Sequence, residues 1–157
     1  MYYSFIMLKP DALKRHLVEQ IMQYFKKEGI EIERLGFKKV DEQLIDVHYA
    51  HVIEKYGDVF RSRLMDYFNG QDTIPMILKS GKESLVADIR RIVGATDPSK
   101  ADHGTIRGDL GDDSFDRCAS ENRSCYNLIH ASDSFENAKE ETAVWFGKEV
   151  SEQYFGK

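Results

Sequence analysis

The chain has 157 residues, a formal net charge of −5 and a hydrophobic content of 41%. This length favours a single domain spanning residues 1–157, and the apolar content is enough for one substantial core. The negative charge argues against nucleic acid as a bulk electrostatic partner, and no apolar stretch is long enough to span a membrane. Two cysteines, Cys118 and Cys125, are too few for a disulfide framework, which favours a reducing cytoplasm. A local disulfide between these two cysteines remains the alternative.

The spacing of apolar residues predicts the elements in chain order. Strands are predicted over residues 3–8, 30–40, 74–78 and 126–130, and helices over 17–25, 44–52, 60–68, 85–93 and 138–146. Gly29 and Gly94 are expected to end two of these helices, and Pro75 favours an edge strand or a strand start. Residues 96–109 form a predicted polar loop. Residues 111–125, acidic and poor in large apolar side chains, are the most loop-like stretch.

The order of these elements predicts an α+β fold. A β-α-β unit, extra helices and a second β-α-β unit are typical of the ferredoxin-like, split βαβ arrangement. We therefore expect an antiparallel four-stranded sheet with additional helices. No internal repeat and no low-complexity linker divides the sequence.

The most informative stretch is the segment from Asn127 to Ser134, where a short apolar run ends in His130. Asp133 with Glu136 three residues later fits a capping box, so His130 is expected where a strand gives way to a helix. Imidazole is a good nucleophile near neutral pH, and backbone donors at a helix start can hold an anion beside it. For a lone histidine, a structural role at a strand end is nevertheless the more common outcome.

This stretch resembles the active-site signature of nucleoside diphosphate kinases, Asn-x-x-His-[Gly/Ala/Ser]-Ser-Asp. Three further blocks resemble the same family: Lys9-Pro10-Asp11 after the first strand, Gly-Thr-Ile-Arg-Gly-Asp at residues 104–109, and Glu140-Glu141 followed by Trp145-Phe146. The blocks occur in the family order and span nearly the whole chain, which makes chance implausible. The resemblance implies an enzyme that exchanges terminal phosphates between nucleotides.

The resemblance also assigns roles in the chemical step. His130 would take the terminal phosphate from a nucleoside triphosphate, become phosphohistidine, and pass the phosphate to a nucleoside diphosphate with ping-pong kinetics. Glu141, helped by Ser132, would orient the imidazole. Lys9 would contact the transferring phosphoryl group and, with Asn127, the ribose 3′-hydroxyl. The alternative for Glu141 is an ion pair on a helix surface.

Other residues would hold the nucleotide. By the same resemblance, Tyr49 would bond near the transferring phosphate, and Arg90, Thr96 and Arg107 would hold the remaining phosphates. Mg²⁺ would bridge the phosphates, so no protein metal ligands are expected. Phe60 would stack on the base, which implies broad use of ATP, ADP, GTP, GDP and other nucleotides. Alternatively, the side chains of Lys9, Arg90 and Arg107 are solvated surface charges, and Phe60 belongs to the apolar core.

Two departures from the family pattern affect these expectations. His103 stands where many members have proline, and the connection between Asp109 and Asn127 is longer than usual. We expect this connection to be a solvated surface excursion near the nucleotide, with Phe115 pinning it to the body. A tolerated surface insertion is the simpler alternative. The resemblance implies a homo-oligomer. Its size is left open, because the sequence lacks the longer tail after residues 145–146 with which many relatives contact a neighbouring subunit.

A second class of function is a nucleotide-binding regulatory module that kept the fold and lost the chemistry. Such a module would be expected to lack at least one residue of the reacting group. The sequence retains all of them: His130, Lys9, Arg107, Asn127 and Glu141. The enzyme is therefore the favoured interpretation.

Overall fold

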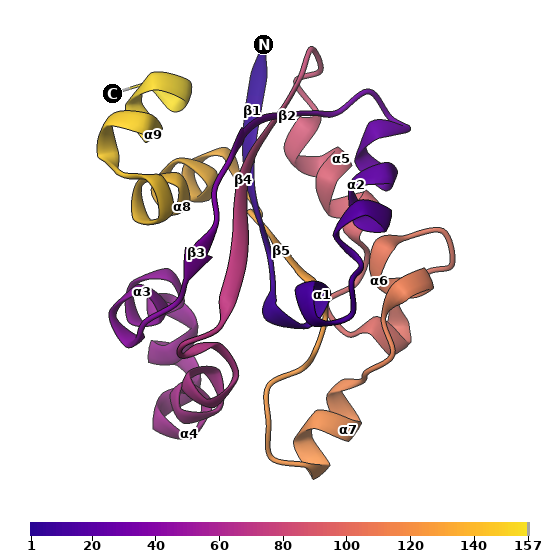
Figure 1. Ribbon diagram of the computed structural model, residues 1–157, viewed down its shortest axis with the longest axis vertical. Coiled ribbons are helices and arrows are strands. Elements are labelled where there is room, and N and C mark those ends of the chain that lie inside the picture. The colour runs from indigo at the N-terminus through magenta and orange to yellow at the C-terminus, as the bar shows by residue number, and fades with distance from the viewer. Residues whose placement is uncertain (157) are drawn as a thin grey trace.

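An antiparallel sheet forms the centre of the computed structural model, which describes residues 1–156 (Figure 1). Its strands are β1 (Tyr2–Leu8), β2 (Glu31–Leu35), β3 (Lys38–Lys39), β4 (Asp72–Ser80) and β5 (Ile129–Ala131). Four of them pair in the order β2-β4-β1-β5, and the short β3 pairs with β4 beyond the end of β2. The α+β, ferredoxin-like prediction is confirmed, but the strand predicted over residues 30–40 is divided into β2 and β3.

Helices cover both faces of this sheet (Figure 1). In chain order they are α1 (Pro10–Lys14), α2 (Val18–Lys26), α3 (Glu42–His48), α4 (Ala50–Phe68), α5 (Leu85–Val93), α6 (Ile106–Leu110), α7 (Phe115–Ser120), α8 (Phe135–Phe146) and α9 (Lys148–Phe155). A 3-10 turn at Pro98–Lys100 and the short helix α6 lie in the stretch predicted as a polar loop. No helix within residues 1–156 is both long and apolar enough to cross a membrane.

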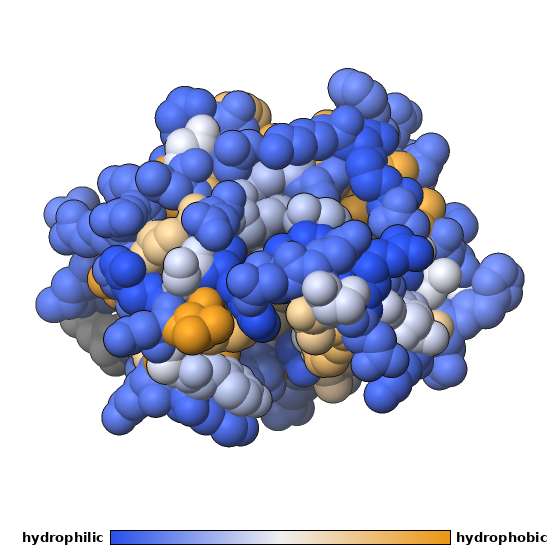
Figure 2. Space-filling model, turned by 90° about the horizontal axis from the view of Figure 1, so that it is seen from below, coloured by the Kyte–Doolittle hydropathy of each residue, from blue (hydrophilic) through white to orange (hydrophobic). Residues whose placement is uncertain are grey.

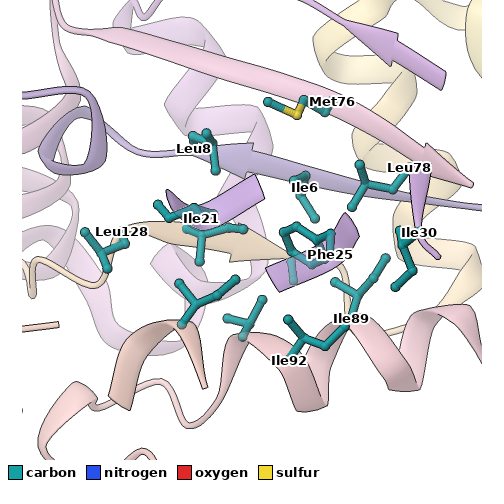
Figure 3. Packing of buried hydrophobic residues seen from close by; sticks show 14 of the residues in the cluster. Ile6, Leu8, Ile21, Phe25, Ile30, Met76, Leu78, Ile89, Ile92 and Leu128 are labelled. Carbon is teal, nitrogen blue, oxygen red and sulfur yellow. The ribbon is translucent and has the colours of Figure 1, made fainter. Parts of the chain in front are cut away.

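The sheet separates two apolar clusters because successive side chains of a strand point to opposite faces. Ile6 and Leu8 of β1 join the cluster covered by α2 and α5, which Figure 3 shows from close by. Phe5 and Met7 join the second cluster, beneath α3, α4, α8 and α9. All four side chains are fully buried. The run at the start of the chain therefore forms the centre of both layers.

Pro75 lies in an interior strand, so the expectation of an edge strand or a strand start is wrong. β4 pairs with β1 on one side and with β2 on the other. The carbonyl of Pro75 accepts a hydrogen bond from Gly36 N at 2.9 Å, and a residue's amide and carbonyl point to the same side of a strand. The missing N–H of Pro75 therefore falls opposite the gap where β2 has ended at Leu35 and β3 has not begun.

Residues 111–125 contain a helix, so the prediction of an entirely solvated loop is wrong. The hydroxyl of Ser114 accepts the N–H of Arg117 at 3.0 Å and caps α7. Cys118 on this helix is buried, and both it and Cys125 are free thiols. A six-residue helix is too short to display an apolar stripe, which explains why the sequence pattern did not predict it.

Two helix boundaries also differ from the predictions. Ser134, not Asp133, caps α8: its hydroxyl accepts the N–H of Asn137 at 3.0 Å, so the predicted capping box is wrong. In α4, Gly57 has a φ of +83° and interrupts the helical path. This break explains why the apolar pattern predicted a separate helix over 60–68.

Candidate active site

A cavity of about 760 Å³ lies between α4, the C-terminal part of α5, α8 and the segments on either side of α7. Nine of the ten residues selected from the sequence line it: Lys9, Tyr49, Phe60, Arg90, Thr96, Arg107, Asn127, His130 and Glu141. The tenth, Ser132, is buried and contacts Glu141. The structure therefore brings the whole predicted set together from segments up to 132 residues apart (141 − 9).

His130 is held by a carboxylate on the neighbouring helix. It lies in the middle of β5, opposite Met7 of β1, and its Nε2 lies 2.8 Å from Glu141 Oε2. The hydroxyl of Ser132 donates to the same carboxylate oxygen. An ionised Glu141 thus accepts two hydrogen bonds and keeps the imidazole proton on Nε2, which leaves a lone pair on Nδ1. The surface ion-pair alternative for Glu141 does not fit, because its side chain is 17% exposed.

Burial and positive charge keep this imidazole neutral. Burial is the main reason that the pKa of His130 falls below its ordinary value of 6.5, and Lys9 and Arg107 lower it further. Burial raises the pKa of Glu141 above its usual range. At pH 7 the ring therefore offers an unprotonated nitrogen to a phosphorus atom.

A strained turn places His130 relative to β1. Leu128, two residues earlier, has a φ of +72°, which is uncommon for a residue with a side chain. Its N–H donates to Asp11 Oδ2 at 3.1 Å, and its carbonyl accepts from Lys9 N at 2.9 Å. The hydroxyl of Tyr67 donates to the other oxygen of Asp11. The Lys9-Pro10-Asp11 block thus fixes the turn that leads into the histidine strand.

Lys9 donates a hydrogen bond to the side-chain amide of Asn127. Its Nζ donates to Asn127 Oδ1 at 2.7 Å, and Asn127 Nδ2 donates to the carbonyl of Thr96 at 3.0 Å. Burial, with Arg107 nearby, lowers the pKa of Lys9 from 10.5 to about 8. The lysine is therefore charged at pH 7 but close to losing its proton in mildly alkaline solution.

The two arginines differ in how firmly they are fixed. Arg107 is 6% exposed and donates to the backbone carbonyls of Gly94, Asn127 and Ile129. Arg90 makes one bond, from Nη1 to the carbonyl of Ala131 at 3.2 Å, and is otherwise exposed. The solvated-charge alternative is thus wrong for Arg107.

Two aromatic side chains complete the set. The hydroxyl of Tyr49 is buried in the cavity wall and has no hydrogen-bond partner within residues 1–156. A buried polar group without a partner is costly, and a phosphate oxygen would satisfy it. Phe60 is half-buried and lines the cavity. Its ring packs at a tilt against that of Tyr56, with the centroids 5.4 Å apart, and also contacts the second apolar cluster. The core-packing alternative for Phe60 therefore holds in part.

The sequence pattern did not single out His48. Its Nδ1 accepts a hydrogen bond from Trp145 Nε1 at 2.9 Å, and its ring lies edge-on to His130 with the centroids 4.6 Å apart. Only its position beside Tyr49 hinted at a place in the site. His48, His130 and Glu141 also place potential ligand atoms within 4.8 Å of one another. Two imidazoles and one carboxylate suit a zinc-like ion, not Mg²⁺, which prefers oxygen ligands.

A ferredoxin-like sheet with a neutral histidine, a lysine and two arginines in one cavity suits the class of proteins that bind and transfer phosphate groups. Comparison with known sequences gives the family: the model of the family described as "Nucleoside diphosphate kinase" matches residues 3–150. A nucleoside diphosphate kinase from Microcystis aeruginosa is 38% identical over 143 residues, covering 91% of this chain and 86% of that relative. One from Methanobrevibacter smithii is 34% identical over 146 residues, covering 93% and 87%. The chain belongs to the nucleoside diphosphate kinase family.

Solved structures agree in fold. The apo nucleoside diphosphate kinase of Encephalitozoon cuniculi has a TM-score of 0.80 at 31% identity, covering 96% of this chain and 92% of that one. A Borrelia burgdorferi enzyme, solved as a transition-state mimic with vanadate and ADP, has a TM-score of 0.86 at 24% identity. This likeness covers 99% of this chain and 97% of the Borrelia chain, and at that identity it shows the fold alone.

Proposed function

We propose that this chain is a nucleoside diphosphate kinase that carries the terminal phosphate on His130. The observation that supports the proposal best is the bond between His130 Nε2 and Glu141 Oε2, 2.8 Å long, in a cavity that Lys9 and Arg107 also line. This bond leaves Nδ1 as the nucleophile, and the cations provide the positive charge that a polyphosphate needs.

The reaction proceeds by two successive phosphoryl transfers. In the first, the lone pair of His130 Nδ1 forms a bond to the γ-phosphorus, and the bond from that phosphorus to the bridging oxygen breaks. The leaving nucleoside diphosphate takes the electron pair on this oxygen. In the second, a terminal oxygen of a different nucleoside diphosphate attacks the same phosphorus, and the phosphorus–nitrogen bond returns its pair to Nδ1. In both steps the proton stays on Nε2, where it is hydrogen-bonded to Glu141.

The remaining residues hold the nucleotide. Lys9 contacts the moving phosphoryl group. The hydroxyl of Tyr49, which has no partner among residues 1–156, donates to one of the oxygens of that group. Arg90, Thr96 and Arg107 hold the other phosphates, and Lys9 with Asn127 contacts the ribose. When bound, Mg²⁺ neutralises phosphate charge; the nitrogen-rich group around His130 is unsuited to it, which supports coordination by the nucleotide itself.

Four further properties belong to the same proposal. Phe60 stacks on the base without bonding its edges, so nucleotides with purine and pyrimidine bases are all accepted. The substrates are nucleoside triphosphates and diphosphates, and no nucleic acid or membrane is required. The free thiols of Cys118 and Cys125 support a cytoplasmic location. We also propose a homo-oligomer, whose size sedimentation would measure.

Steady-state kinetics test this function. With ATP and GDP varied against each other in the presence of Mg²⁺, we expect parallel lines in double-reciprocal plots, the pattern of a covalent exchange. Intersecting lines would show that both nucleotides bind before transfer and would contradict the phosphohistidine route. Absence of exchange by the folded protein would remove the enzyme proposal altogether.

A further inference from the structure

The imidazole of His48 lies in the cavity wall beside His130, and the proposed mechanism gives it no role. His48 ends α3, which packs with α8 on one face of the sheet (Figure 1). The rings of the two histidines meet edge to face, with the centroids 4.6 Å apart and the planes at 81° to each other. An imidazole so close to a reacting one is a candidate for controlling its orientation.

A tryptophan fixes the tautomer of His48. The indole nitrogen of Trp145 can only donate, and it donates to His48 Nδ1 at 2.9 Å. Nδ1 must therefore hold a lone pair, so the neutral ring of His48 carries its hydrogen on Nε2.

This bond lies inside the molecule. The surface at the end that carries α4 and α7 is mainly hydrophilic, with a few apolar patches (Figure 2). Trp145, by contrast, is 4% exposed and packs in the second apolar cluster together with Phe5. A buried N–H that lost its acceptor would be costly, so Trp145 holds the ring of His48 in one orientation.

His48 is neutral at pH 7, as His130 is. Burial is the main reason that the pKa of His48 falls from 6.5 to about 3. His130 and Lys9 lower this pKa further, and Glu141 acts in the opposite direction. Tyr49, whose ring lies edge-on to His48, has a hydroxyl pKa that burial raises, so it is un-ionised. His48 therefore packs against the reacting ring without adding a positive charge that would compete for Glu141.

The ring of His130 is confined by two groups. Glu141 Oε2 lies 2.8 Å from Nε2 of His130, and the ring of His48 lies against the same imidazole. One nitrogen of each histidine and a carboxylate oxygen of Glu141 all lie within 4.8 Å of one another. Rotation of an imidazole about its Cβ–Cγ bond is intrinsically soft, so packing has to hold it. Without the ring of His48, His130 would be free to turn away from Glu141.

We propose that His48, held by Trp145, is a positioning residue for phosphate transfer that keeps the ring of His130 against Glu141, with Nδ1 towards the nucleotide. This inference rests on the proposed function, because it concerns the orientation of the same nucleophile. His48 acts through His130 and not on the nucleotide, so it affects the rate of phosphorylation and not the affinity for ADP. It also determines which isomer of phosphohistidine forms.

Single-turnover phosphorylation by ATP tests the effect on rate. We expect His48→Ala to lower this rate about ten- to a hundredfold and to leave the affinity for ADP, measured by calorimetry, within about twofold. His48→Asn keeps an acceptor for the N–H of Trp145, which protects the fold. Because asparagine lacks the ring, this variant should still be slowed about tenfold or more. The matched control is His103→Ala, whose native side chain is 98% exposed and outside the cavity; we expect it to change neither quantity.

Phosphorus NMR of the phosphorylated proteins tests the orientation. The wild type should carry phosphate on Nδ1 of His130 alone. In His48→Ala and His48→Asn we expect a second signal, from phosphate on Nε2, because a turned ring can carry its hydrogen on Nδ1 instead. A side chain that only supported the fold would change the rate and leave the isomer unchanged.

Three results would overturn the inference. The first is a wild-type rate of phosphorylation in folded His48→Asn. The second is a pair of slowed variants that form only the Nδ1 isomer. The third is a loss of ADP affinity as large as the loss of rate, which would make His48 a nucleotide contact. All three leave the proposed function standing, whereas a wild type that takes no phosphate from ATP contradicts the proposed function itself.

Discussion

At His130, one carboxylate oxygen decides which ring nitrogen can react. Glu141 Oε2 binds both His130 Nε2 and the hydroxyl of Ser132, so it fixes the tautomer and the orientation of the ring together. We expect Glu141→Ala to lower the single-turnover rate of phosphorylation by ATP roughly ten- to a thousandfold without abolishing it. Glu136→Ala, exposed on the same helix and outside the cavity, is the control. Full activity of the Glu141 variant would reduce this residue to a structural charge.

Lys9 gives the site a pH dependence of its own. Its pKa is lowered to about 8, so the free protein loses this positive charge as the pH rises through that value. We expect kcat/KM, which reports the free enzyme, to fall on the alkaline side of pH 8. The lowered pKa of His130 keeps its ring neutral below pH 6.5, so no decline is expected near that value.

Lys9→Arg provides the control for this profile. A guanidinium remains protonated across the range, so the alkaline decline should disappear even if the overall rate is lower. A decline near pH 8 that persists in Lys9→Arg would assign it to another group. Activity that falls as the pH drops through 6.5 would contradict the neutral histidine.

For single residues, the sequence predicted the candidate reacting groups better than the residues that pack around them. The motif around His130 and the Lys9-Pro10-Asp11 block pointed to residues that the structure brings into one cavity. His48 was not singled out, because its contact with Trp145 joins positions 97 residues apart and leaves no local pattern. The roles of all these residues stay proposals until variants are measured.

Among the elements, three segments converge on a single guanidinium. Arg107 of α6 donates to the carbonyl of Gly94 at the end of α5, of Asn127 before β5, and of Ile129 in β5. From the sequence, Arg107 was expected to bind a phosphate of the nucleotide. The structure shows that it also joins three segments through their backbone carbonyls. Removing the side chain would take away the guanidinium donor to the buried carbonyl of Ile129, whereas the carbonyl of Asn127 would still accept the N–H of Ile129 at 2.8 Å.

Arg107→Ala should therefore affect stability as well as binding. We expect it to lower the free energy of unfolding by roughly 2–4 kcal/mol, measured by urea denaturation. It should also weaken ADP binding more than Thr96→Ala does, because a guanidinium makes charge-assisted, bidentate contacts and a hydroxyl makes one neutral bond. Calorimetry with ADP on both variants measures the second effect. Equal losses of affinity, or unchanged stability, would count against this assignment.

The predicted elements failed where helices are short or a cap is ambiguous. α7 has only six residues, so its helical pattern is not visible without its cap, Ser114. At α8, Asp133 and Ser134 are both good caps, and only the backbone geometry selects the serine. β4 tolerates Pro75 because of a gap between neighbouring strands that depends on tertiary pairing.

For the whole molecule, the sheet order is what assembles the site. β1 pairs with β5, so the end of β1 places Lys9 beside the turn at Leu128, and Met7 lies opposite His130. Periodicity predicted both strands but contains no information on which strands are neighbours. The order of the elements predicted the split βαβ fold class, which the structure confirms, but which strands pair is seen only in the structure.

The central claim is that His130 carries the phosphate between two nucleotides. The most direct measurement is to incubate the pure protein with γ-labelled ATP and Mg²⁺ without acceptor, isolate the protein, and map the label by peptide mass spectrometry. We predict an acid-labile, base-stable label on His130, up to one per chain, which GDP removes as labelled GTP and which His130→Ala does not acquire. A label on another residue, or labelled GTP formed by the folded His130→Ala protein, would contradict the account.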